Sequence, residues 1–150
     1  KAIHLVRHPV STCLRRTHLT SRLDNPIGAQ TLSAAYDALG WRRDPREDPD
    51  HIRNAASWVY QVGKVLDACR AYGPDRYCEI RLEDLIAEPQ RVSDDIARFT
   101  GKPPVRSELA QVIDPGRVSQ WSRDDPKAKA VWEICEPAAA ALGYTFEDGA

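Results

Sequence analysis

The sequence contains no methionine, and it also lacks the patterns that mark membrane segments, metal sites and structural disulfides. No apolar run approaches the roughly 18 residues that a membrane-spanning helix requires, and no signal peptide is visible. Cys13, Cys69, Cys78 and Cys135 are widely spaced, without a Cys-x-x-Cys pair or a histidine spacing that suits zinc. We therefore expect a cytoplasmic protein with reduced thiols, no bound metal and no transmembrane segment.

The chain also has no excess of positive charge and no phosphate-binding loop of the G-x-x-x-x-G-K-[ST] type. Its 21 lysines and arginines stand against 22 aspartates and glutamates, which gives a net charge of −1 at pH 7. A nucleic-acid-binding surface would need a basic excess, so no nucleic-acid partner is expected and any anion site must be local. Hydrophobic residues at 42% and charged residues at 29% indicate a globular domain with a core.

The first residues carry the most informative motif. Residues 3–6 form a short apolar run that ends on Arg7, and Pro9 then begins a basic stretch that predicts a helix over residues 9–23. The carboxyl end of a buried parallel strand is where α/β folds bind ligands, and the first turn of a helix offers free N–H groups to a phosphate. We therefore expect Arg7 to contribute to an anion site, and the alternative is a strand-end arginine in a surface ion pair.

This stretch resembles the 3′-phosphate-binding segment of sulfotransferases that use 3′-phosphoadenosine 5′-phosphosulfate (PAPS), in which a strand ends in Arg-Asp-Pro or Arg-Asn-Pro before a helix. Arg7 and Pro9 match that pattern, and His8 replaces the aspartate or asparagine. Arg15 stands where the family has a serine on the same phosphate, and Ser11 precedes it by one helical turn. The resemblance implies that Arg7, Ser11 and Arg15 bind the 3′-phosphate, while a solvated helix face is the alternative for Arg15.

A second segment carries the same resemblance. Residues 76–89 are similar to the family's stretch in which a strand runs into Tyr-Glu-Asp-Leu, a short acidic loop and a proline. Leu82 replaces the tyrosine, and the helix that follows, over residues 90–100, ends in the family's Phe-x-Gly pattern. Glu83 and Asp84 are expected to fix the loop, with a catalytic carboxylate pair as the alternative.

The C-terminal region supplies a third match. Residues 115–121 and the helix ending at residues 141–144 are similar to bacterial members, in which an arginine precedes a tryptophan and the last helix closes in Leu-Gly-Tyr. The resemblance implies that Arg117 closes over the 3′-phosphate, and the alternative is an exposed loop arginine. Trp121 is expected to be a packing residue.

The expected fold is α/β, with strands over residues 2–7 and 76–81 separated by long helices. The resemblance implies a three-layer parallel sheet with helices on both sides, a P-loop NTPase-like sulfotransferase fold with a helix-rich C-terminal part. Two strands alone do not make a stable sheet. The family's 5′-phosphosulfate loop and general base would lie upstream of Lys1, so residues 1–150 are expected to form one domain, the C-terminal part of a sulfotransferase domain. No catalytic residue is assigned.

The implied activity is transfer of a sulfuryl group from PAPS to a hydroxyl or amine acceptor, leaving adenosine 3′,5′-bisphosphate. The acceptor is expected to be a small molecule, a glycan or a lipid, held by a pocket shaped around residues 32–58. Two other classes stay open. One is a P-loop-type nucleotide-dependent kinase whose arginine-rich helix binds a substrate phosphate. The other is a non-catalytic anion-binding or interaction module, suggested by the absence of a serine at position 15 and a tyrosine at position 82.

Overall fold

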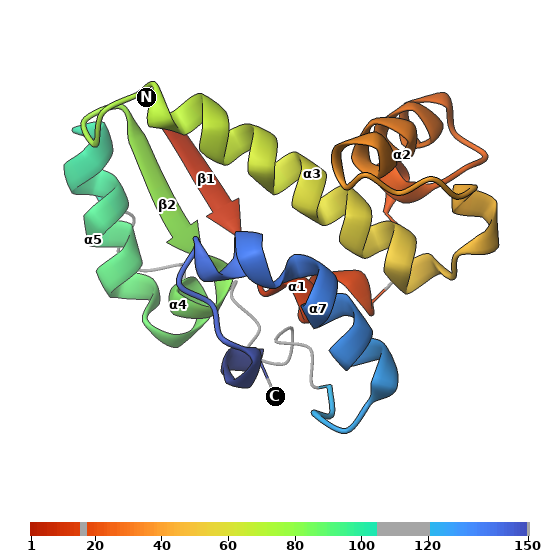
Figure 1. The fold of residues 1–150 in the computed structure, drawn as a ribbon. Helices are drawn as coiled ribbons and strands as arrows, with labels where there is room; N and C mark the ends of the chain where they lie inside the picture. Colours follow the sequence, from red (N-terminus) through yellow and green to blue (C-terminus); the bar gives the residue numbers. More distant parts are fainter. Residues whose placement is uncertain (16–17, 105–120, 150) are drawn as a thin grey trace. The chain divides into compact units, whose positions relative to one another are not determined.

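The computed structural model of the chain describes residues 1–15, 18–104 and 121–149, and these belong to two units. The first unit contains residues 1–8 and 65–119, and the second contains residues 9–64 and 120–150. The long helix α3 (Asp50–Arg70) contributes residues to both. Each unit is described by itself below, with the labels of Figure 1.

In the first unit, β1 (Ala2–Val6) and β2 (Tyr77–Arg81) lie side by side as a parallel pair, with α5 (Pro89–Thr100) alongside (Figure 1). The register runs from Ala2 opposite Tyr77 to Val6 opposite Arg81. The short helix α4 (Leu82–Ala87) follows β2 directly and packs on both β2 and α5. The two strands and the helix over residues 90–100 are therefore confirmed to within a residue, and the chain has an α/β fold.

One face of β1 is incompletely covered. Ile3 and Leu5, which alternate along the strand and so share a face, are 44% and 54% exposed. Parallel strands are normally buried on both faces, because helices cover them. Within the described ranges the sheet consists of these two strands, and the three-layer sheet with helices on both sides stays a prediction.

The second unit is helical. Its core forms where Leu32, Ala35 and Tyr36 of α2 pack on Ala56 of α3. The described elements are α1 (Pro9–Cys13), η1 (Leu19–Ser21), α2 (Pro26–Ala38), η2 (Pro45–Glu47), the first part of α3, α7 (Pro126–Ala140) and η4 (Phe146–Gly149). Local signals explain where α2 begins, since the Asn25 side chain accepts hydrogen bonds from the backbone N–H groups of Ile27 and Gly28.

The helix predicted over residues 9–23 is wrong in its length, because α1 ends at Cys13. Two side chains lie at hydrogen-bonding distance from the last carbonyl oxygens of α1, which in a longer helix would accept hydrogen bonds from backbone N–H groups. Asn54 Nδ2 donates to the Cys13 carbonyl oxygen at 2.9 Å, and His18 Nε2 lies 3.2 Å from the Thr12 carbonyl oxygen. The end of α1 is therefore fixed by a contact with α3, and residues 14–15 form a turn instead of continuing the helix.

Two further sequence signals concern helices of this unit: Asp50 predicts a cap before the long helix, and Pro137 predicts a kink or a division of the closing helix. Asp50 is the first residue of α3 and pairs with Arg53, instead of standing before the helix as its cap. The closing helix α7 runs through Pro137 and is not divided there. Its N-terminus is capped by Asp125, whose carboxylate accepts the Lys127 N–H at 2.8 Å.

The C-terminal aromatic residues pack together. The ring centroids of Trp121 and Phe146 are 4.9 Å apart, and those of Trp132 and Phe146 are 5.7 Å apart. The structure thus gives Trp121 the packing role that the sequence predicts. In the part of the chain that is described, no helix combines the length and the apolar character needed to cross a bilayer.

Candidate functional site

The carboxyl edge of the β1–β2 pair is the place where the sequence predicts an anion site. Because Val6 pairs with Arg81, Arg7 and Leu82 leave the two strands at the same edge. Arg7 is half-buried there. Ligands of parallel α/β sheets bind at this edge, so the structure places Arg7 where a strand-end guanidinium can meet a ligand.

The loop after Arg7 is held by α4 of the same unit. The backbone N–H of His8 donates a hydrogen bond to Glu83 Oε1 at 2.9 Å, and the His8 side chain is fully buried. Glu83 lies in the first turn of α4, where a negative charge also interacts favourably with the helix dipole. This contact gives Glu83 a structural role in the loop after Arg7, whereas the sequence predicts that Glu83 and Asp84 fix the loop of their own segment.

Two of the other predicted phosphate ligands, Ser11 and Arg15, belong to the second unit. Ser11 is in α1 of the second unit and is 2% exposed, whereas Arg15 is exposed in the turn after that helix. The shared helix face predicted for these two residues does not form, because α1 ends at Cys13. Arg117 lies outside the described residues. The assignment of these residues, together with Arg7, to one phosphate site stays a prediction.

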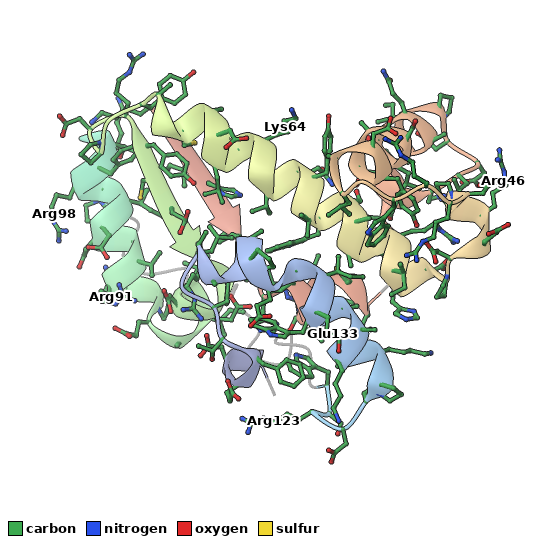
Figure 2. The ribbon with its side chains drawn as sticks, in the orientation of Figure 1. Arg46, Lys64, Arg91, Arg98, Arg123 and Glu133 are labelled. Atoms are coloured by element: carbon green, nitrogen blue, oxygen red, sulfur yellow. The ribbon has the colours of Figure 1, made fainter. Side chains whose placement is uncertain are left out.

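Other arginines of the first unit are engaged in exposed ion pairs. Arg91 and Arg98 project from α5 on the side away from the strands (Figure 2). Arg91 pairs with Glu88 at 2.6 Å, and Arg98 pairs with Asp95 at 2.8 Å. Such pairs contribute roughly 0–1 kcal/mol each, and their exposure sets these residues apart from Arg7.

A polar pocket of about 180 Å³ lies in the second unit. Its lining comes from three segments: Thr12 of α1, then His18, Thr20 and Ser21 in and before η1, then Asn54, Ser57, Trp58 and Gln61 of α3. The sequence-based expectation of an acceptor pocket around residues 32–58 includes three of these positions and misses the others. A signal was available in the sequence, because Asn54, Ser57 and Gln61 recur at helical spacing and so share one face of the long helix.

The side chains around this pocket form a connected network. Ser21 Oγ donates to the His18 carbonyl oxygen at 3.0 Å and also lies within hydrogen-bonding distance of Asn54 Oδ1. Ser57 Oγ donates to the Thr20 carbonyl oxygen at 3.1 Å. Gln61 Nε2 in turn donates to Ser57 Oγ at 2.9 Å. The network ties residues 18–21 to α3 and so holds this side of the pocket.

Among residues 1–15, 18–104 and 121–149, no group of three or more histidines, cysteines, aspartates and glutamates is arranged to hold a metal ion. The cysteines of the described part are free thiols, and Cys13 and Cys135 are buried. Burial raises the pKa of the Cys135 thiol well above its ordinary value, and the neighbouring Cys13 acts in the same direction.

Comparison with known proteins assigns the chain to a class. The family model described as "Sulfotransferase family" matches residues 1–106, which is most of the chain. The chain therefore belongs to the sulfotransferase family.

Among solved structures, the chain is similar to the sulfotransferase domain from the curacin biosynthetic pathway, with 19% sequence identity and a TM-score of 0.57. That likeness covers 95% of this chain and 53% of the other, so the chain spans about half the length of the structure that it matches. At this identity the likeness shows the fold alone. A comparison with curated proteins found no match.

Proposed function

We propose that this chain is part of a PAPS-dependent sulfotransferase, and that it binds the 3′-phosphate of the donor. The reaction would transfer the sulfuryl group to a hydroxyl or amine acceptor and leave adenosine 3′,5′-bisphosphate. The observation that carries the proposal is Arg7 at the carboxyl edge of the parallel strands, next to a backbone N–H that Glu83 holds in place. Membership of the sulfotransferase family supports it.

The chemistry of the donor set suits a phosphate. The planar guanidinium of Arg7 can grip two phosphate oxygens at once and stays charged at any biological pH. Arg15 is exposed and would add a second charge, while Ser11 and Arg117 would add a hydroxyl and a third guanidinium. These residues anchor and orient the donor. Sulfuryl transfer, like phosphoryl transfer, depends mainly on such positioning and on neutralising charge on the leaving phosphate.

The proposal is tested by calorimetric titration of adenosine 3′,5′-bisphosphate into the longest polypeptide that carries this sequence, with 5′-AMP as the comparison ligand. Tight binding of the bisphosphate and little binding of AMP is the expected result. One charge-assisted contact contributes about 1.5–3 kcal/mol, so Arg7→Ala is expected to weaken bisphosphate binding about tenfold to a hundredfold and to raise the KM for PAPS.

Arg98→Ala is the matched control, because Arg98 is an exposed arginine of the same unit whose partner is Asp95. This variant is expected to bind the bisphosphate like the wild type. Equal effects of the two substitutions would remove the central claim. If neither nucleotide binds to the wild type, the non-catalytic interaction module becomes the better account.

The finer fold is part of the same proposal: residues 1–150 form the C-terminal part of one domain whose three-layer parallel sheet contains further strands. The exposure of Ile3 and Leu5 on a parallel strand supports it. In the longest polypeptide, Leu5→Cys should be protected from a thiol reagent. Leu19→Cys, in the second unit and also 54% exposed, is the control that should react. Equal reaction of both would contradict a covering element.

A further inference from the structure

The second unit contains two cysteines, and both lie in its core. Cys13 is the last residue of α1 and is 2% exposed, and Cys135 lies in α7 and is fully buried. Cys69 and Cys78 belong to the first unit. The two core cysteines are 122 positions apart in the sequence, so the fold alone determines whether they meet.

Contacts with α3 bring the two core cysteines to one place. Asn54 Nδ2 donates a hydrogen bond to the Cys13 carbonyl oxygen at 2.9 Å. Cys135 Sγ is 3.9 Å from the carbonyl oxygen of Ala55, which is the next residue of α3. In addition, α1 packs directly on α7. Both cysteines therefore lie against the same turn of α3, at a place where their own helices touch.

The two thiols also interact with each other. Burial raises the pKa of the Cys135 thiol, and a hydrogen bond with the Cys13 side chain raises this pKa further. A disulfide joins its sulfur atoms at about 2 Å and holds the two Cβ atoms about 3.5–4.5 Å apart. Side chains that already share a hydrogen bond need only a small movement to reach that geometry.

We propose that Cys13 and Cys135 form a disulfide when the chain folds under oxidising conditions, and that this bond ties α1 to α7. In the reduced protein the same two thiols act as small apolar packing residues of the core. The second unit then has two covalent states, and the redox conditions during folding select between them. The inference does not depend on the proposed function.

The oxidant is a small disulfide such as oxidised glutathione. One cysteine thiolate attacks it, which forms a mixed disulfide and releases one glutathione. The second cysteine thiolate attacks the protein sulfur of this mixed disulfide, which forms the Cys13–Cys135 bond and releases the second glutathione. The protein loses two electrons to the oxidant, and the two thiol protons end on the two glutathione molecules.

The exchange depends on when the thiols are accessible. Attack requires a thiolate that the oxidant can reach, and burial withholds both conditions from the folded pair. The bond is therefore expected to form while the second unit folds or opens, and to exchange slowly once the core has closed.

The first test compares cysteine pairing in the folded and the unfolded chain. The longest polypeptide that carries this sequence is reduced and unfolded in urea, and it is then oxidised with a glutathione redox buffer, either during refolding or still in urea. Free thiols are blocked, and mass spectrometry of the peptides identifies the linked pairs. In urea the short loop is favoured: Cys69 and Cys78 are 9 positions apart, and closing that loop is roughly 50-fold more favourable than closing one of 122 positions.

Refolding is expected to reverse this preference. Among the cysteines of this sequence, the linked peptide that contains Cys13 and Cys135 should predominate, because the fold supplies the contact that the unfolded chain lacks. A yield of this peptide no higher after refolding than in urea would overturn the inference, and the two thiols would then be packing residues only.

The second test measures what the bond does to stability. A disulfide that closes a long loop restricts the unfolded chain, so the oxidised protein is expected to unfold at a urea concentration roughly 1–2 M higher than the reduced protein. An unchanged midpoint in protein that carries the bond would contradict a tie between α1 and α7.

Two variants assign this shift to the proposed pair. Cys135→Ala should abolish the difference between oxidised and reduced samples, whereas Cys78→Ala, which removes a cysteine of the first unit, is the matched control that should keep it. Each variant is compared only with its own reduced form, so any cost of the substitution itself cancels. Loss of the shift in Cys78→Ala with retention in Cys135→Ala would assign the stabilisation to another pair and overturn the inference. The peptide analysis of the wild type tests the pairing even if Cys135→Ala does not fold.

Discussion

Removal of the Glu83 carboxylate tests how the loop after Arg7 is held. Glu83 Oε1 accepts the His8 backbone N–H at 2.9 Å, so a substitution there acts on the residue next to the proposed phosphate ligand. Glu83→Ala removes the acceptor, whereas Glu83→Gln keeps an oxygen at the same place and removes only the charge. The two variants therefore separate the hydrogen bond from its charge.

The magnitude follows from this contact. A hydrogen bond to a charged group contributes about 1.5–3 kcal/mol, and a neutral one contributes about 0.5–1.5 kcal/mol. Glu83→Ala is therefore expected to lower the free energy of unfolding by about 1.5–3 kcal/mol, and Glu83→Gln by about 1 kcal/mol. Because the loop also carries Arg7, bisphosphate affinity should fall in the same order.

Asp84→Ala is the matched control. Asp84 follows Glu83 in the first turn of α4, so both carboxylates interact similarly with the helix dipole. Its removal is expected to change the free energy of unfolding by no more than about 0.5 kcal/mol. Urea unfolding measures all three variants, and with a slope of about 1–3 kcal/mol per molar urea the Glu83→Ala shift is easily resolved.

Two results would refute the reasoning. Equal destabilisation by Glu83→Ala and Asp84→Ala would mean that the hydrogen bond to His8 does not hold the loop. Loss of turnover in Glu83→Gln, with stability and bisphosphate affinity intact, would instead restore the interpretation of Glu83 as a catalytic carboxylate.

Three further outcomes are expected. Gly28→Ala should destabilise the protein by about 2 kcal/mol or more, because the added Cβ would overlap backbone carbonyl oxygens of the preceding loop. The control Gly63→Ala lies in open space on α3 and should stabilise the protein by about 0.5–1 kcal/mol in the same urea assay. An unchanged free energy of unfolding in Gly28→Ala would contradict this packing. Burial lowers the pKa of His4, so this side chain binds a proton less well in the folded state than in the unfolded chain. The free energy of unfolding should therefore fall as the pH drops below 6.5, and it should fall less steeply in His4→Gln. Cys135 is fully buried and its thiol has a raised pKa, so it should react with a thiol reagent only when the protein unfolds. Half-buried Cys69 is the control that should react in the native state. Rapid labelling of Cys135 in the native state would contradict the described core.

The sequence predicts best the features that depend on local signals. The β strands and α5 are apolar runs and periodic stretches bounded by turn residues, and α2 begins at an Asn-Pro pair that both caps and starts a helix. The contact of Glu83 with the loop after Arg7 was also within reach, because both residues follow parallel strands and so leave the sheet at one edge.

What the sequence does not predict depends on distant residues. The end of α1 is set by Asn54, which lies 41 positions further along the chain. No local sequence pattern around Cys13 predicts that the helix ends there. The predicted length of α1 also determines a prediction about the site, because Ser11 and Arg15 share a helix face only if the helix continues past Cys13. The lining residues outside residues 32–58 were missed for the same reason, because the walls of the pocket come from α1, η1 and α3 together.

The two units have a consequence for how the protein can be synthesised and recombined. Residues 1–8 belong with residues 65–119, and residues 9–64 belong with residues 120–150, so the segments alternate along the chain. No single cut separates one unit from the other, and neither can be moved to another protein as an uninterrupted cassette. During translation, β1 stays without its partner until β2 has emerged, and α1 stays without α7 until residues 126–140 have emerged. Deletion of α7 therefore removes the packing partner of α1, although the two helices are more than 100 residues apart in the sequence.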